Sequence, residues 1–223
     1  MKESQKNAKK RLAAIAALLE ERYPEAECAL KYEGDPWRLL VMGRLSAQCT
    51  DERVNRVSVA LFARYPNAAA MAEADLPELE SLVESCGLFR TKARDLKAAS
   101  QMLCQEFGGR LPDTMEELLR LPGVGRKIAN LLLGDIFGRS AVVADTHCIR
   151  LSGRWGFVPE GKRDPLLVER TLTPLLEGTN ASDFCHRAVL FGREVCTARS
   201  PRCHECELAA AELCKSRERR AHG

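Results

Sequence analysis

The sequence predicts an all-α protein, and three observations lead to that class. Apolar residues recur at the three- and four-residue spacing of a helix face in successive segments, beginning with residues 6–22. Proline, glycine and helix-capping side chains stand between those segments and leave only short connections. No segment alternates apolar and polar residues over the length of a strand, and the apolar run 141–144 is too short to count as one.

Each expected helix begins or ends at a residue that favours a helix end. Asp35 precedes Pro36, which places an N-cap before a proline at the first helical position. Asp75 and Glu78 form a capping box, and Gly87 follows the end of the same helix. The expected helices are residues 6–22, 36–47, 51–64, a short one after Asn67, 76–86, one capped by Thr91 and running to Phe107, 114–120, 126–137, 146–154, 165–177 and 181–195.

A tight turn, Leu121-Pro-Gly-Val-Gly-Arg-Lys127, connects two of these helices. Thr114 and Glu117 predict a capping box that opens the first helix, and Pro122 ends it. Gly123 and Gly125 permit a turn with free backbone N–H groups. The second helix then offers N–H donors and a positive dipole end to a phosphate. Because such turns also join ordinary core helices, the turn alone does not establish nucleic-acid binding.

Lys127 and Asp145 are the candidate catalytic residues. Lys127 follows Arg126 at the positive end of the second helix, and both neighbours are expected to lower its pKa by disfavouring the ammonium form. A lowered pKa matters because only the neutral amine is a nucleophile. Asp145 is expected to cap the next helix, whose N-terminus keeps the carboxylate ionised. The structural alternatives are a solvated lysine and an aspartate that only caps.

Four cysteines near the end of the chain, Cys196, Cys203, Cys206 and Cys214, have the spacing Cys-x6-Cys-x2-Cys-x7-Cys. Four thiolates in a short, loop-rich segment can hold a [4Fe–4S] cluster or a tetrahedral zinc ion. Zinc ribbons usually pair two Cys-x2-Cys knuckles, and this segment has only one. The polar residues between the cysteines argue against four buried structural cysteines.

Composition and charge indicate where the protein acts and how its cysteines are used. The formal net charge is only +3, so any DNA affinity must come from local basic patches. The first residues are polar and do not form a signal peptide, and the apolar run 12–19 is too short to span a bilayer. We therefore expect a cytoplasmic protein in a reducing environment. Four of the ten cysteines would be ligands, and six would pack mostly as small apolar residues: Cys28, Cys49, Cys86, Cys104, Cys148 and Cys185.

The order and spacing of these motifs resemble the endonuclease III family of helix-hairpin-helix DNA glycosylases, from about residue 37 to residue 214. Leu45-Ser-Ala-Gln-Cys-Thr-Asp51 resembles the family's motif at the mouth of the damaged-base pocket, and Gly87-Leu88, followed by Lys92-Ala93, resembles its second DNA-facing loop. The chain departs from the family at Ile128, where threonine is more usual, and in the gap before Cys214, which usually has five residues. The resemblance implies that DNA is bound by Gln48, Leu88, Leu121, Gly123, Val124, Gly125, Arg126, Arg199 and Arg202.

The resemblance also implies an architecture and an activity. Residues 29–139 would form a six-helix domain with the hairpin, and residues 1–28 and 140–223 a helical domain with the [4Fe–4S] cluster loop, the two flanking a DNA-binding cleft. With Lys127 as the nucleophile, the chain would be a monomeric, bifunctional DNA glycosylase/AP lyase. It would act on double-stranded DNA that contains damaged bases or AP sites, excise oxidised pyrimidines and nick the strand by β-elimination through a Schiff base. Two alternatives stay open: a monofunctional mismatch or alkylation glycosylase, and a non-catalytic, cluster-containing DNA-binding protein.

Overall fold

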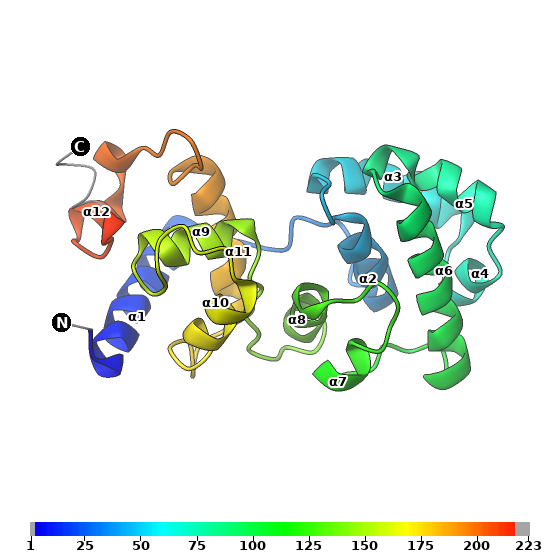
Figure 1. Cartoon of the computed structure of the whole chain (residues 1–223), viewed down its shortest axis with the longest axis horizontal. Coiled ribbons are helices and arrows are strands. Elements are labelled where there is room, and N and C mark those ends of the chain that lie inside the picture. The colour runs from blue at the N-terminus through cyan, green and yellow to red at the C-terminus, as the bar shows by residue number, and fades with distance from the viewer. Residues whose placement is uncertain (1–2, 217–223) are drawn as a thin grey trace. The chain divides into compact units, whose positions relative to one another are not determined.

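The structure is a computed structural model that describes residues 3–216. These residues form twelve α-helices and two short 3-10 helices, and no strand occurs among them (Figure 1). The all-α prediction is therefore confirmed. The chain divides into two compact units, here called the hairpin unit (residues 28–138) and the terminal unit (the described parts of 1–27 and 139–223).

The hairpin unit is built around α2 (Pro36–Leu45), in which seven of ten residues are buried. The Trp37 ring lies 5.5 Å from the Phe62 ring, and its Nε1 donates to Ser100 Oγ at 3.3 Å. A Cβ added to Gly43 would lie 3.4 Å from Ile128 Cγ2, so a glycine allows α2 to approach the hairpin closely. The other elements are α3 (Asp51–Arg64), α4 (Ala68–Ala72), α5 (Leu76–Val83), η1 (Glu84–Cys86), α6 (Phe89–Glu106), α7 (Met115–Leu118) and α8 (Arg126–Asp135).

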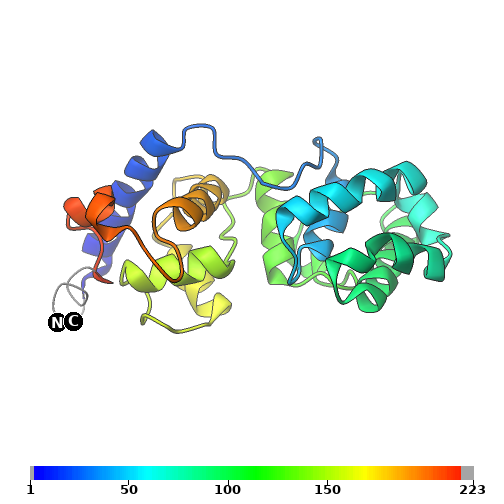
Figure 2. The same ribbon diagram turned by 90° about the horizontal axis from the view of Figure 1, so that it is seen from above.

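The terminal unit combines the first helix with the last third of the chain. Its elements are α1 (Gln5–Arg22), α9 (Thr146–Arg154), α10 (Pro165–Leu172), α11 (Ala181–Glu194), η2 (Cys203–Glu205) and α12 (Glu207–Ala210). α1 packs against α11 and α12, as Figure 2 shows from above. Trp155 follows α9 and is buried against Phe184 and Phe191 of α11, with ring centroids 6.1 Å and 6.3 Å apart.

Most helix starts agree with the sequence. Asp35, Asp75, Thr114 and Asp145 are N-caps whose side chains accept backbone N–H bonds. The prediction that Thr91 caps a helix is wrong, because α6 already begins at Phe89. The reason is the positive φ of Gly87 and of the N-cap Leu88, 69° and 49°, which turns the chain before Thr91 is reached.

Several helices end earlier than expected. The helices predicted to end at residues 47, 120, 137 and 177 end at 45, 118, 135 and 172, because turns replace their last residues. The short elements η2 and α12 have no counterpart in the prediction. Both lie among the cysteines, where the segment is too short for helical periodicity to appear.

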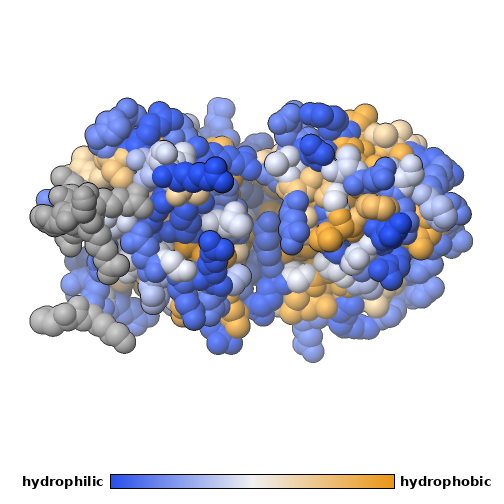
Figure 3. Space-filling view, turned by 45° about the horizontal axis from the view of Figure 1, so that its top comes forward, coloured by the Kyte–Doolittle hydropathy of each residue, from blue (hydrophilic) through white to orange (hydrophobic). Residues whose placement is uncertain are grey.

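On the face drawn in Figure 3, polar and apolar side chains are interspersed. Three large apolar side chains are exposed among the described residues: Val59, Leu88 and Leu119. Single exposed apolar side chains are ordinary on a protein surface. None of the helices in residues 3–216 has both the length and the apolar character that crossing a membrane requires.

Candidate active site and cluster loop

The hairpin turn exposes the N-terminus of α8. Thr114 Oγ1 accepts from Glu117 N at 3.3 Å, which confirms Thr114 as the N-cap of α7, and the hydroxyl donates to Glu117 Oε2 at 2.8 Å. Leu121 and Val124 are buried, and Val124 N donates to Leu121 O at 3.0 Å. Gly125 is the N-cap of α8 and offers no side chain to its N–H groups. The first N–H groups of a helix have no partner within it, so this end suits an anion such as phosphate.

The two glycines of the turn, Gly123 and Gly125, differ in their backbone angles and in the space around them. Gly123 has a φ of 76°, and an added Cβ would lie 2.6 Å from Arg44 Nε and 2.8 Å from Asp95 Cβ. Arg44 and Asp95 form an ion pair with Nη2 and Oδ2 2.7 Å apart, so the turn packs directly on that pair. Gly125 has a φ of −98°, and an added Cβ would meet nothing within 4 Å. Gly123 therefore serves the fold, whereas Gly125 leaves open space beside the helix N-terminus.

Lys127 is the second residue of α8, and its side chain is exposed. It forms no ion pair with any residue that the structure describes. Arg126 precedes it and is exposed as well. The amine therefore stands in the first helical turn after Gly125, where the helix end favours an anion and a bound DNA backbone would lie within reach.

Asp145 is half-buried at the start of α9 in the terminal unit. Its Oδ1 accepts from Cys148 N at 2.7 Å, which confirms the predicted cap. The residue has an extended backbone with φ −84° and ψ −178°. Because Oδ1 accepts this helix N–H, the carboxylate is held in place at the start of α9.

Two arginines of α9 hold the first residue of the cluster loop, and the sequence analysis did not identify them. Arg150 Nη2 donates to Cys196 O at 3.2 Å and to Gly192 O at 2.8 Å. Arg154 is buried and donates to the backbone oxygens of Cys196, Thr197 and Ala198. Burial, and then the charge of Arg154, lowers the pKa of Arg150. The four-residue spacing of the two arginines on one helix was the available signal.

The four cysteines lie in one short segment as free thiols. Cys196 is buried, Cys206 and Cys214 are half-buried, and Cys203 is exposed. Among residues 3–216, no three His, Cys, Asp or Glu side chains are grouped closely enough to hold a single metal ion.

The chemistry of the donors nevertheless fits an iron–sulfur cluster. Arg154 Nη1 lies 3.1 Å from Cys196 Sγ, and a buried guanidinium is stabilised when negative thiolate charge lies beside it.

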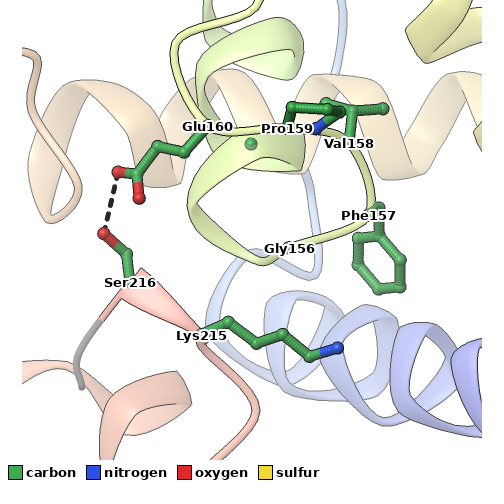
Figure 4. A pocket seen from close by; sticks show the side chains of 8 residues that line it. Gly156, Phe157, Val158, Pro159, Glu160, Lys215 and Ser216 are labelled. Atoms are coloured by element: carbon green, nitrogen blue, oxygen red, sulfur yellow. Dashed lines mark hydrogen bonds between the residues drawn. The ribbon is translucent and has the colours of Figure 1, made fainter. Parts of the chain in front are cut away.

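The residues on both sides of Cys214 are fixed to the body of the terminal unit. Arg11 Nη1 donates to Leu213 O at 3.0 Å, and Ser216 Oγ donates to Glu160 Oε1 at 2.8 Å. Figure 4 shows Lys215 and Ser216 beside the 156–160 loop, where they line a hollow of about 430 Å³. Cys214 Sγ lies 3.4 Å from Arg154 O. Cys196 and Cys214 therefore both contact Arg154, Cys196 at the guanidinium and Cys214 at the backbone oxygen.

The other candidate DNA-binding residues lie in two places. Gln48 and Leu88 are in the hairpin unit, both with positive φ, at 54° and 49°. Arg199 and Arg202 are exposed in the cluster loop of the terminal unit. Arg202 Nη2 donates to Glu194 O at 2.7 Å, and its Nη1 lies 3.6 Å from Glu205 Oε2.

Known proteins match this chain over most of its length. Residues 41–177 match the family described as HhH-GPD superfamily base excision DNA repair protein, and residues 196–210 match the iron-sulfur binding domain of endonuclease III. Endonuclease III of Synechocystis sp. is 46% identical over 194 residues, which is 86% of this chain and 87% of that protein.

Solved structures agree. A non-covalent endonuclease III–DNA complex and a trapped endonuclease III–DNA covalent intermediate each match with a TM-score of 0.88 and 37% identity, over 96% of this chain and 99% of theirs. The chain therefore belongs to the endonuclease III family of the HhH-GPD superfamily, the DNA glycosylases and AP lyases of base excision repair that bind a [4Fe–4S] cluster.

Proposed function

We propose that this protein excises oxidised pyrimidines, such as thymine glycol, from double-stranded DNA and then nicks the strand, with Lys127 as the nucleophile. The observation that carries the proposal is the exposed Lys127 in the first turn of α8, two residues after the open space at Gly125 and without an ion pair to any of residues 3–216. The likeness to a trapped endonuclease III–DNA covalent intermediate supports a covalent route. We further propose that the protein acts as a monomer in the cytoplasm, with residues 29–139 as one domain and residues 1–28 and 140–223 as the other.

In the proposed reaction, the Lys127 nitrogen bonds to C1′ of a flipped nucleotide while the bond from C1′ to the base breaks. The base leaves with a proton, and opening of the sugar gives a Schiff base between Lys127 and C1′. Loss of a proton from C2′ then expels the 3′ phosphate by β-elimination. Asp145 stabilises the cationic sugar and carries protons, and the bond from Cys148 N holds its carboxylate in place for this role.

The DNA-binding residues divide by role. Gln48 and Leu88 enter the duplex and fill the space left by the flipped nucleotide, which offsets part of the cost of unstacking. Leu121, Gly123 and Val124 shape the hairpin turn, while Gly125 and Arg126 bind phosphate through the helix N-terminus. Arg199 and Arg202 bind phosphate from the cluster loop.

The ligands of the cluster are Cys196, Cys203, Cys206 and Cys214. When bound, the cluster supplies a rigid, charged anchor that orders the loop between its ligands. Arg154 donates hydrogen bonds to the sulfur and the backbone oxygen of Cys196, so the first residue of the cluster loop is held in place. Iron and sulfide analysis of Cys214→Ser tests the ligand set: we expect loss of the four-iron centre, and a stable centre would remove Cys214 from it.

The experiment that tests the proposed function is borohydride trapping combined with Lys127→Ala. We expect wild-type protein to release thymine glycol, nick the strand and become covalently trapped on DNA, whereas Lys127→Ala binds damaged DNA but does none of these. Lys162→Ala, at another exposed lysine, is the control and keeps full activity. Base release without nicking by the wild type would instead indicate a monofunctional glycosylase.

A further inference from the structure

One lysine of the hairpin unit is completely buried. Lys92, in the first turns of α6, has 0% of its surface exposed and is among the largest fully buried side chains of the described residues. Lysine is rarely buried in this way, because its ammonium loses its hydration. Burial accordingly lowers the pKa of Lys92. A residue that is this costly to bury requires an explanation, and the proposed chemistry does not use it.

The ammonium of Lys92 donates hydrogen bonds to three backbone oxygens, which take the place of its water shell. Its Nζ donates to Leu45 O at 2.8 Å, to Ala47 O at 2.7 Å and to Cys86 O at 2.8 Å. An ammonium has three N–H groups, so each donor is used once. Two of the acceptors lie at the end of α2 and the third lies in η1, about forty residues later in the chain. One side chain therefore joins two loops that are distant in sequence.

Those two loops carry the residues proposed to enter the duplex. Gln48 follows the acceptor Ala47 directly, and Leu88 follows the acceptor Cys86 by two residues. Both have left-handed backbones, which residues other than glycine adopt only when their surroundings enforce it. Leu88 is 56% exposed and caps α6 without any side-chain bond, so its own side chain does not hold it there.

We propose that Lys92 is a positioning residue that fixes the 45–48 and 86–88 loops to each other, so that Gln48 and Leu88 enter the duplex from a preformed geometry. The proposal rests on the proposed role of those two residues. Preformed loops need no ordering when DNA binds, so the binding free energy is left to extrude the damaged nucleotide. No other side chain fits as well, because a guanidinium is planar and its N–H groups cannot point at three oxygens arranged around one nitrogen.

The test compares two DNA substrates with Lys92→Met, which keeps the length of the side chain and removes its three donors. One substrate has thymine glycol paired with adenine, and the other has the same lesion in an unpaired bubble, where the base has already left the stack. We expect single-turnover excision to fall about 10- to 100-fold on the paired lesion and less than about 3-fold in the bubble. An equal fall on both substrates would overturn the proposal, because a purely structural defect does not distinguish them.

Lys97→Met is the matched control. Lys97 lies on the same helix and donates to a single backbone oxygen, Ala74 O, at 2.7 Å, away from both loops. We expect this variant to excise the lesion from both substrates at rates within about twofold of wild type, as for a site remote from the chemistry. If Lys97→Met shows the same preference for the bubble, loss of any hydrogen-bonded lysine of α6 is responsible and the proposal fails.

A measurement on the wild type tests the preformed geometry of the two loops even if Lys92→Met does not fold. Backbone amide order parameters of residues 46–48 and 86–88 should be near 0.85, the value of rigid helices, and values below about 0.6 would refute a preformed geometry. This measurement also separates the two proposals. Wild-type protein that leaves thymine glycol intact on both substrates would contradict the proposed function, while the order parameters would still test whether the two loops are preformed.

Discussion

Asp145 combines a structural and a proposed chemical role, and one substitution separates them. Asparagine keeps an oxygen that can accept from Cys148 N but loses the negative charge. We expect Asp145→Asn to fold normally and to excise bases about 10²- to 10⁴-fold more slowly, the range for losing a positioned acid–base group. Thermal melting checks the fold of the variant, and single-turnover kinetics measure its excision rate. A rate loss that merely follows a fall in melting temperature would leave Asp145 as a cap alone.

At the scale of single residues, the sequence predicted the role of a residue where that role depends on its immediate neighbours in the chain. Asp145 precedes a helix and Thr114 stands three residues before Glu117, so both caps could be inferred and both are present. Lys92 belongs to the motif of the second DNA-facing loop, but neither its role nor that of Arg154 could be found in this way. Their roles depend on burial and on oxygens supplied by segments about forty residues away, which no local pattern encodes.

At the scale of elements, the hairpin turn gives a paired prediction. Gly123→Ala must place a Cβ against Arg44 and Asp95 at a φ of 76°, so we expect it to lower the free energy of unfolding by about 1–3 kcal/mol. Gly125→Ala meets open space at an allowed φ, and stability should change by less than about 0.5 kcal/mol.

The same pair separates folding from DNA binding. Because the space at Gly125 is proposed to receive a phosphate, we expect Gly125→Ala to weaken binding to DNA of any sequence while keeping the fold. Chemical denaturation and binding titrations at fixed salt measure the two effects. Equal losses of stability in both variants would show that Gly125, like Gly123, is needed for the turn itself.

Helices could be predicted where caps and periodicity agree, and they were misplaced where a tertiary contact sets the boundary. α6 starts at Phe89 and not after Thr91, because Gly87 and Leu88 turn the chain first and Lys92 holds that turn from within. In the cluster loop, cysteine spacing predicted the chemistry but not η2 or α12, since a four-residue helix leaves no periodic signal.

At the scale of the whole chain, the terminal unit is closed by residues from both ends of the described sequence. Arg11 of α1 donates to Trp155 O at 2.6 Å and to Leu213 O at 3.0 Å, which joins the first helix to the residue before Cys214. Glu3 holds Arg11 through an ion pair with Nη2 and Oε2 2.8 Å apart and also contacts Lys215. The support of the cluster loop therefore includes the beginning of the chain.

This closure should depend on pH through Glu3. Its hydrogen bond from Arg11 is the main cause that lowers the pKa of Glu3 from 4.5 to about 2, against an opposing effect of burial, and the bond from Lys215 adds to the lowering. Because the folded-state pKa is depressed, the contribution is complete above the unfolded-state value of 4.5 and is lost as the pH falls towards 2.

We expect Glu3→Gln, which can still accept hydrogen bonds, to lower the free energy of unfolding by about 1 kcal/mol at pH 7, as befits an ion pair near the surface. The difference from wild type should be constant between pH 7 and pH 5 and should shrink below pH 4.5, and urea denaturation across that range measures it. Lys9→Gln breaks the exposed pair with Glu177 and is the control, with almost no effect at any pH. A Glu3→Gln deficit that persists unchanged at pH 4 would mean that the shape of the side chain, and not its charge, closes the terminal unit.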